Sequence, residues 1–235
     1  MDLITQIWAR ATMMQEPPSG TVVLLTAGVA LVCLAVPTLW HLTRHVLTIV
    51  HEGAHATVAV LTGRRLEGVR LHSDTSGLTL SVGRPRGPGM IAMAFAGYTG
   101  PAVLGLAAAW VLGSGYAVGL LWLLVVALGL LLVQVRNWYG LWTVLVSLAV
   151  LVGVTWWAAP VWQSTFAYVL TWFLLLGAPR AVLELQASRR RDRGAHTSDA
   201  DILATLTHLP GLVWVGAFLV VTSSALAVAA VLLVR

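Results

Sequence analysis

The sequence predicts an all-α integral membrane protein with about seven transmembrane helices and a short β-hairpin at the membrane face. Hydrophobic residues make up 58% of the 235 residues and charged residues only 10%, whereas a soluble domain has about 25% charged residues. The apolar residues gather into runs of about 20, the length that a helix needs to cross a bilayer. All 14 basic residues are arginine, and most lie between these runs. The distribution of these arginines, which give the chain a net charge of +5, therefore indicates how the chain is oriented in the membrane. The lipid bilayer is therefore an expected partner, and nucleic acid is not.

The N-terminal lead, residues 1–20, ends at the helix-breaking sequence PPSG. It has no basic segment ahead of a short apolar run with a cleavage site, so we expect no removable signal peptide. Residues 21–235 should form a single membrane domain. Its first span covers about residues 21–40, and Pro37 should kink its end. The single cysteine, Cys33, excludes an internal disulfide.

The second predicted span, about residues 42–62, carries the sequence HEGAH at 51–55. In a helix, His51 and His55 lie one turn apart and face the same way. Two such imidazoles can hold one zinc ion, and Glu52 can act as the general base on a metal-bound water. The alternative is a structural role, in which neighbouring helices supply hydrogen-bond partners for these polar side chains. An ionisable cluster is costly in lipid, however, which favours the functional interpretation.

The polar side chains of this span share one face. At about 100° per residue they fall within an arc of about 120°, and apolar side chains occupy the opposite side. The polar arc contains His41, Arg44, His45, Thr48, His51, Glu52 and His55. Such a stripe is expected to face the protein interior rather than lipid.

Residues 66–86 alternate between apolar and polar types and contain the turn signal DTSG at 74–77. We expect a β-hairpin that lies at the membrane face and does not cross it. Its edge strand could pair with an extended segment of a substrate, and the alternative is a solvated loop without a role. His72 and Asp74 are expected to be turn residues first and ligands only second.

Five further apolar runs predict the remaining spans. They cover about residues 90–112, 116–135, 136–157, 160–176 and 211–233. The run that starts at residue 160 should continue as a polar helix through Arg180 and Glu184. A polar linker follows at residues 186–201, and Ser198 with Asp199 can cap a helix after it.

The arginine-rich run 189–193 in this linker is the strongest marker of orientation, and we expect it to be cytoplasmic. Alternation across seven spans then places the N-terminus in the cytoplasm as well. Arginine without lysine, together with abundant Ala, Val, Leu and Gly, is typical of a GC-rich bacterial genome. The expected location is therefore a bacterial plasma membrane.

Five short motifs carry a family resemblance. They are HExxHA at 51–56, DTSGLT at 74–79, AGYxGP at 96–101, RNW at 136–138 and SDA at 198–200. With these motifs the chain resembles the site-2 protease family of intramembrane zinc metalloproteases, and within it the bacterial and fungal branch that lacks a PDZ domain. The resemblance implies a Zn2+ cofactor ligated by His51 and His55, a water activated by Glu52, and hydrolysis of a membrane-anchored protein substrate.

The third zinc ligand is left open by this resemblance. The wider family supplies an aspartate from an NPDG motif, and Tyr139 occupies that position in the NWYG sequence of this chain. Compared with the closer branch, Asn137 stands at the aspartate position, although an amide oxygen is a weaker, neutral ligand. Asp199 in the SDA motif is an equal alternative unless it only caps a helix, and Asp201 ranks below both.

Three functions are compatible with these features. The favoured one is an intramembrane zinc endopeptidase, because a binding role requires no acidic residue between two histidines. A catalytically inactive membrane scaffold or binding protein is the alternative, favoured by the missing aspartate. A transporter would need further buried charges in the later spans, which contain almost none. The sequence carries no signal for an oligomeric state.

Overall fold

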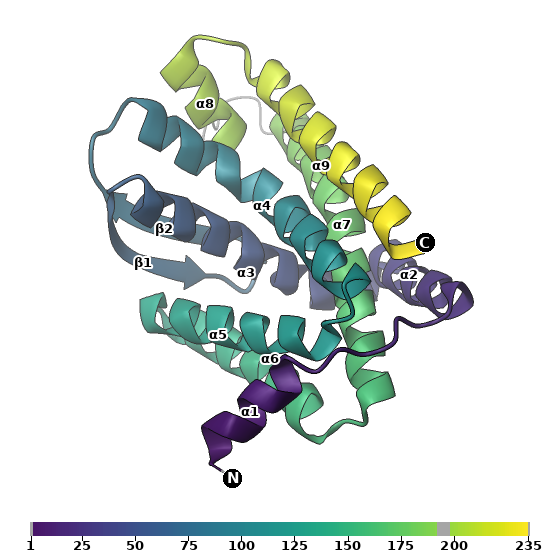
Figure 1. The fold of residues 1–235 in the computed structure, drawn as a ribbon. Helices are drawn as coiled ribbons and strands as arrows, with labels where there is room; N and C mark the ends of the chain where they lie inside the picture. The colour runs from purple at the N-terminus through teal and green to yellow at the C-terminus, as the bar shows by residue number, and fades with distance from the viewer. Residues whose placement is uncertain (1, 192–197, 235) are drawn as a thin grey trace.

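A computed structural model describes residues 2–191 and 198–234, which are mostly helical (Figure 1). The helices are α1 (Leu3–Ala11), α2 (Gly20–Ala35), α3 (Pro37–Leu61), α4 (Pro88–Gly113), α5 (Ala117–Gln134), α6 (Trp138–Trp157), α7 (Pro160–Arg191), α8 (Asp199–Thr207) and α9 (Gly211–Val234). The strands are β1 (Arg65–Leu71) and β2 (Gly77–Val82).

The described residues form fewer membrane spans than the seven that we expected. Five helices, α4, α5, α6, α7 and α9, are long and apolar enough to cross a bilayer. The pair α2 and α3 qualifies only as one span with a bend of 105°, which gives at most six. α2 has 16 residues, fewer than the roughly 20 that a bilayer needs, and α3 carries the polar stripe. A mostly helical membrane protein is thus confirmed, whereas the described helices provide five or six candidate spans and not the seven expected.

The bend between α2 and α3 lies at Val36 and Pro37, about one turn earlier than the expected end of the first span. Val36 is extended, with φ −83° and ψ 116°. Pro37 begins α3, a position where its missing N–H costs no helical hydrogen bond. From α7, Arg180 donates a hydrogen bond to the carbonyl of Leu34, and its guanidinium lies 4.2 Å from the ring centre of Trp40. A charged side chain of α7 therefore supports the broken end of α2.

The expected β-hairpin is present, with β1 and β2 antiparallel to each other. In the connecting turn, the carboxylate of Asp74 accepts hydrogen bonds from the backbone N–H (3.0 Å) and the hydroxyl (2.7 Å) of Ser76, as is typical of a turn that begins with Asp. The hydroxyl of Thr48 on α3 donates a 2.8 Å hydrogen bond to the carbonyl of Thr75. This hydrogen bond holds the turn of the hairpin against α3.

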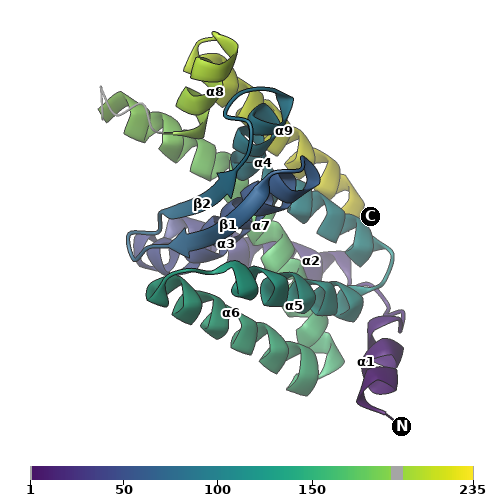
Figure 2. The same cartoon turned by 90° about the vertical axis from the view of Figure 1, so that its left-hand side faces the viewer.

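The elements are arranged around α3 (Figures 1 and 2). The helices α5 and α6 lie on one side of α3 and the hairpin, and α4, α8 and α9 lie on the other, while α7 extends past both groups. α3 and α4 approach closely because Gly100 leaves room for Ala54, which a Cβ at position 100 would overlap. This close approach brings the polar face of α3 against α4.

α7 continues as one helix through Pro179 to Arg191, so the polar extension that the sequence predicted is confirmed. Part of the expected linker 186–201 is therefore helical. Residues 192–197, and with them Arg193 of the arginine-rich run, lie outside the described residues.

Candidate metal centre

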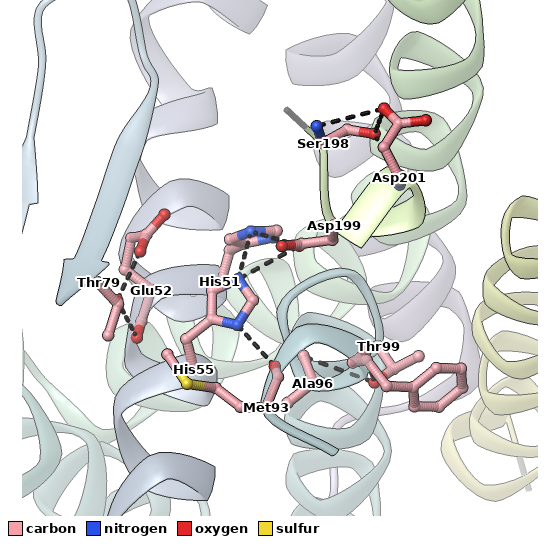
Figure 3. Close-up of polar contacts among 11 residues, drawn as sticks. His51, Glu52, His55, Thr79, Met93, Ala96, Thr99, Ser198, Asp199 and Asp201 are labelled. Carbon is pink, nitrogen blue, oxygen red and sulfur yellow. Dashed lines mark hydrogen bonds and ion pairs between the residues drawn. The ribbon is translucent and has the colours of Figure 1, made fainter. Parts of the chain in front are cut away.

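His51 and His55 face the same side of α3, toward α4 (Figure 3). Their Nε2 atoms are 3.0 Å apart, and the two rings meet edge to face. Gly97 of α4 lies directly against them, because a Cβ at this position would collide with both imidazoles. Only a glycine fits there, so the spacing of the two histidines is set by one helix and supported by another.

The orientation of each imidazole is fixed by a contact with α4. Nδ1 of His55 lies 2.7 Å from the carbonyl oxygen of Met93. A carbonyl oxygen only accepts, so Nδ1 donates its proton there and the neutral ring keeps the lone pair of Nε2 for a metal. The ring of His51 packs edge to face on Tyr98, with 4.8 Å between ring centres. Both Nε2 atoms therefore point to one place.

Asp199 reaches the two histidines from the first residue of α8. Its Oδ2 atom lies 3.3 Å from Nε2 of His51 and 3.2 Å from Nε2 of His55 (Figure 3). Burial raises the pKa of Asp199, but the two histidines lower it by more when their Nε2 atoms carry protons, as they can without a metal, so the pKa lies below its usual range. A carboxylate oxygen thus faces two imidazole nitrogen atoms.

This donor set fits zinc. The three side chains offer atoms that lie within 4.8 Å of one another, and their separations are 3.0, 3.2 and 3.3 Å. Ligand atoms of a tetrahedral zinc site with bonds of about 2.0–2.1 Å are expected to lie about 3.3 Å apart. Two imidazoles and a carboxylate are ligand types that zinc accepts, and catalytic zinc sites use three protein donors.

Glu52 belongs to the same polar side of α3 but points toward strand β2 and not toward α4 (Figure 3). Its Oε2 atom accepts a 2.6 Å hydrogen bond from the hydroxyl of Thr79. Gly77 lies so close to the carboxylate that a Cβ there would overlap it. The hairpin therefore holds a buried carboxylate, 4% exposed, in one position beside the histidines.

A single cavity of about 590 Å³ connects these groups. Its walls include His51, Glu52, His55 and Asp199, together with the hairpin turn, residues 74–79. The volume lies in the range of about 300–1,000 Å³ that is common for ligand-binding pockets. The polar side of α3 thus faces one space, with nitrogen donors toward α4 and a fixed carboxylate toward β2.

Asn137, the other expected third ligand, lies at the junction of β1 and α6. Its Oδ1 accepts a 3.1 Å hydrogen bond from the N–H of Leu71, and its Nδ2 donates one of 2.7 Å to the carbonyl of the same residue. Tyr139 places its hydroxyl 3.3 Å from Nε2 of His45. Neither Asn137 nor Tyr139 lines the cavity. The side chain of Asn137 is used to join β1 to α6.

Asp201, the third alternative, belongs to the capping box of α8. Its Oδ2 accepts a 2.5 Å hydrogen bond from the hydroxyl of Ser198, and its Oδ1 lies 2.6 Å from Nη2 of Arg189. Ser198 is the N-cap, as expected, but the helix begins at Asp199. The cap and the candidate ligand are therefore different residues, because Asp199 and Asp201 lie two positions apart and point in different directions.

Three residues that shape the site were not singled out from the sequence: Thr79, Met93 and Gly97. Thr79 belongs to the DTSGLT motif and Gly97 to the AGYxGP motif, so both positions could have been found from these motifs. Thr79 is needed there for a hydrogen bond to Glu52, and Gly97 for a close contact between helices. Met93 acts through its backbone carbonyl, which any residue could supply, and it left no signal.

Comparison with known families gives one match. Residues 24–229 match the family model of peptidase M50B-like proteins. The match covers most of the chain and includes all of the residues that form the candidate metal centre. Comparisons with curated proteins and with solved structures gave no match.

Proposed function

The chain belongs to the peptidase M50B-like family, the assignment that its resemblance to site-2 proteases implied, and we propose that it is an intramembrane zinc metalloprotease. The observation that carries the proposal is the approach of Asp199 to His51 and His55 within 3.3 Å, next to the buried carboxylate of Glu52. A binding protein has no need of this combination.

His51, His55 and Asp199 would hold the zinc ion. When bound there, zinc would lower the pKa of a water molecule and polarise the carbonyl of the scissile peptide bond. The hydrogen bond from His55 to the backbone of Met93 keeps the imidazole in the tautomer that binds metal. Asp199 contributes a negative charge that offsets part of the charge of the ion.

Glu52 would act as the general base and then as the general acid. Its carboxylate takes a proton from the attacking water as the water oxygen bonds to the carbonyl carbon. It then returns the proton to the amide nitrogen as the C–N bond breaks. The hydrogen bond from Thr79 fixes the rotation of the carboxylate and so keeps it aimed during both transfers.

The substrate we propose is a membrane-anchored protein that enters the cavity as an extended segment. The cavity is bounded by helices of the membrane domain and by the hairpin, which supports a substrate that arrives from the membrane. A helical segment would present carbonyls that are already hydrogen-bonded within the helix, so the segment must unwind before hydrolysis.

The test compares the purified full-length chain with Glu52→Gln, using fluorescently labelled casein in detergent as an unstructured probe. We expect cleavage by the wild type and a loss of about 10²–10⁴-fold in rate for Glu52→Gln, with unchanged zinc content. Glu67→Gln, which alters an exposed carboxylate of the hairpin, is the matched control and should cleave normally.

Two results would count against the proposal. Equal cleavage by wild type and Glu52→Gln would exclude Glu52 as the base. A wild type that holds one zinc per chain but cleaves neither casein nor any single-span membrane peptide would favour the alternative, a catalytically inactive scaffold or binding protein.

A further inference from the structure

The third donor is carried by a very short helix. α8 has nine residues, and helices of this length are marginal on their own in water, so its position must come from tertiary contacts. Ala200 and Leu203 are fully buried, and α8 packs against α4 and α9. Apolar contacts of this kind favour docking, but they are not directional and allow the helix to rotate.

Asp201 supplies a directional contact that joins α8 to α7. Its Oδ1 atom lies 3.1 Å from Nε and 2.6 Å from Nη2 of Arg189. Its Oδ2 atom accepts hydrogen bonds from the hydroxyl (2.5 Å) and the backbone N–H (3.3 Å) of Ser198. One carboxylate therefore ties the N-terminus of α8 both to its own cap and to a neighbouring helix.

Arg189 is itself held at a junction of three helices. Its Nη1 donates a 3.2 Å hydrogen bond to Oε1 of Gln186 on the same helix, α7. The guanidinium lies against Gly211, the first residue of α9, so closely that a Cβ at this position would overlap Nη2. The arginine thus has a defined place that depends on the absence of a side chain on α9.

We propose that the Arg189–Asp201 bridge positions Asp199 on His51 and His55. Two residues along a helix correspond to a rotation of about 200°, so Asp201 faces α7 while Asp199 faces α3. Fixing the direction of Asp201 fixes the rotation of α8, and a rotation by one residue, about 100°, would carry Asp199 away from the histidines. Arg189 is a positioning residue in this scheme, and the inference rests on the proposed zinc site.

The experiment measures the zinc affinity of the full-length chain in detergent by competition with a chromophoric chelator. Three variants disturb the bridge in different ways. Arg189→Met removes the cation, Asp201→Asn can keep the cap but loses the ion pair, and Gly211→Ala displaces the guanidinium while both residues of the bridge keep their identity. We expect each to weaken zinc binding by about 10–100-fold, as loss of a residue that orients a metal ligand does.

Two matched controls alter equivalent positions that lack the contacts. Arg190→Met changes the next, exposed arginine of α7, and Gly216→Ala adds a Cβ on α9 where nothing lies within 4 Å. Both should bind zinc within about twofold of the wild type. A second readout is amide hydrogen exchange of residues 199–207 in chelator-treated protein. It should rise in the three bridge variants and stay unchanged in α4.

The outcomes separate this inference from the proposed function. Wild-type zinc affinity in both Arg189→Met and Gly211→Ala would overturn the positioning role even if the wild type cleaves casein. Weakened zinc affinity in these variants, with a wild type that cleaves nothing, would support the bridge and contradict the protease. A variant that loses thermal stability but keeps zinc affinity and slow exchange in α8 would show a purely structural role and overturn the inference. If Arg189→Met does not fold, Gly211→Ala decides.

Discussion

The candidate site has a local half and a remote half. In the local half, His51, Glu52 and His55 lie within little more than one turn of α3, and helix geometry alone sets their relation. In the remote half, Asp199 arrives from α8 and meets the histidines at 3.2–3.3 Å because tertiary contacts hold that short helix. The geometry of the local half should tolerate substitutions elsewhere in the chain. The position of Asp199, in contrast, depends on every contact that holds α8.

The side chains of the local half contact two different neighbours of α3. Both histidines face α4, where Gly97 permits their approach, and Glu52 faces β2, where Gly77 does the same. The proposed metal binding and the proposed proton transfer therefore depend on separate neighbours. Substitution of either glycine should disturb one property and spare the other.

The largest effect is expected for Gly97→Ala. The added Cβ would collide with both imidazoles, so zinc binding should fall by at least about 10-fold, and overpacking should lower the free energy of unfolding by about 1–3 kcal/mol. Zinc titration and thermal unfolding would measure these effects. Gly53→Ala, inside the HEGAH sequence but with nothing within 4 Å, is the control and should bind zinc normally. Equal zinc affinity in both variants would contradict the close contact.

A smaller and more selective effect is expected for Gly77→Ala. Its Cβ would overlap the carboxylate of Glu52, and displacement of a catalytic group by about 1 Å can cost up to about 100-fold in rate. Casein cleavage should therefore fall by about 10–100-fold while zinc content stays at the wild-type value. Loss of zinc together with activity would show that the histidines and Glu52 do not depend on separate neighbours.

The smallest effect concerns the hairpin turn and its response to acid. Hydrogen bonds from Ser76 lower the pKa of Asp74 below its usual value. The stabilisation should therefore be present above about pH 4 and be lost as the pH falls further. Because Asp74 is exposed, Asp74→Asn should reduce the free energy of unfolding by less than about 0.5 kcal/mol at pH 6, and the difference should shrink steadily as the pH falls below about 4. A difference that stays constant below about pH 4 would rule out this origin.

The features that could be predicted from the sequence are those governed by neighbouring residues. The HEGAH spacing, the hairpin with its Asp74 turn and the cap at Ser198 all depend on local geometry. The polar stripe was visible as well, but it reduces the hydropathy of α3. Because of this low hydropathy and the break at Pro37, where α3 begins, α2 and α3 qualify only together as one bent span in place of the two spans that we expected.

The third ligand could not be selected in this way, because the number of residues between two positions does not give their distance in the folded chain. Asn137 and Asp199 were equal alternatives until the fold placed them. Asn137 then proved to bond both of its polar atoms to Leu71, and Asp199 lay beside the histidines. The Arg189–Asp201 bridge was equally invisible, since an arginine-rich run is usually a solvated segment that marks membrane orientation.

The most direct measurement is the zinc content of the purified chain, determined by elemental analysis for the wild type, His51→Ala, Asp199→Ala and Asn137→Ala. We expect about one zinc per chain in the wild type, little in His51→Ala and Asp199→Ala, and the wild-type amount in Asn137→Ala, which should instead lose about 1–2 kcal/mol of stability. Zinc retained by Asp199→Ala and lost by Asn137→Ala, or no zinc in a well-folded wild type, would contradict the proposed metal centre.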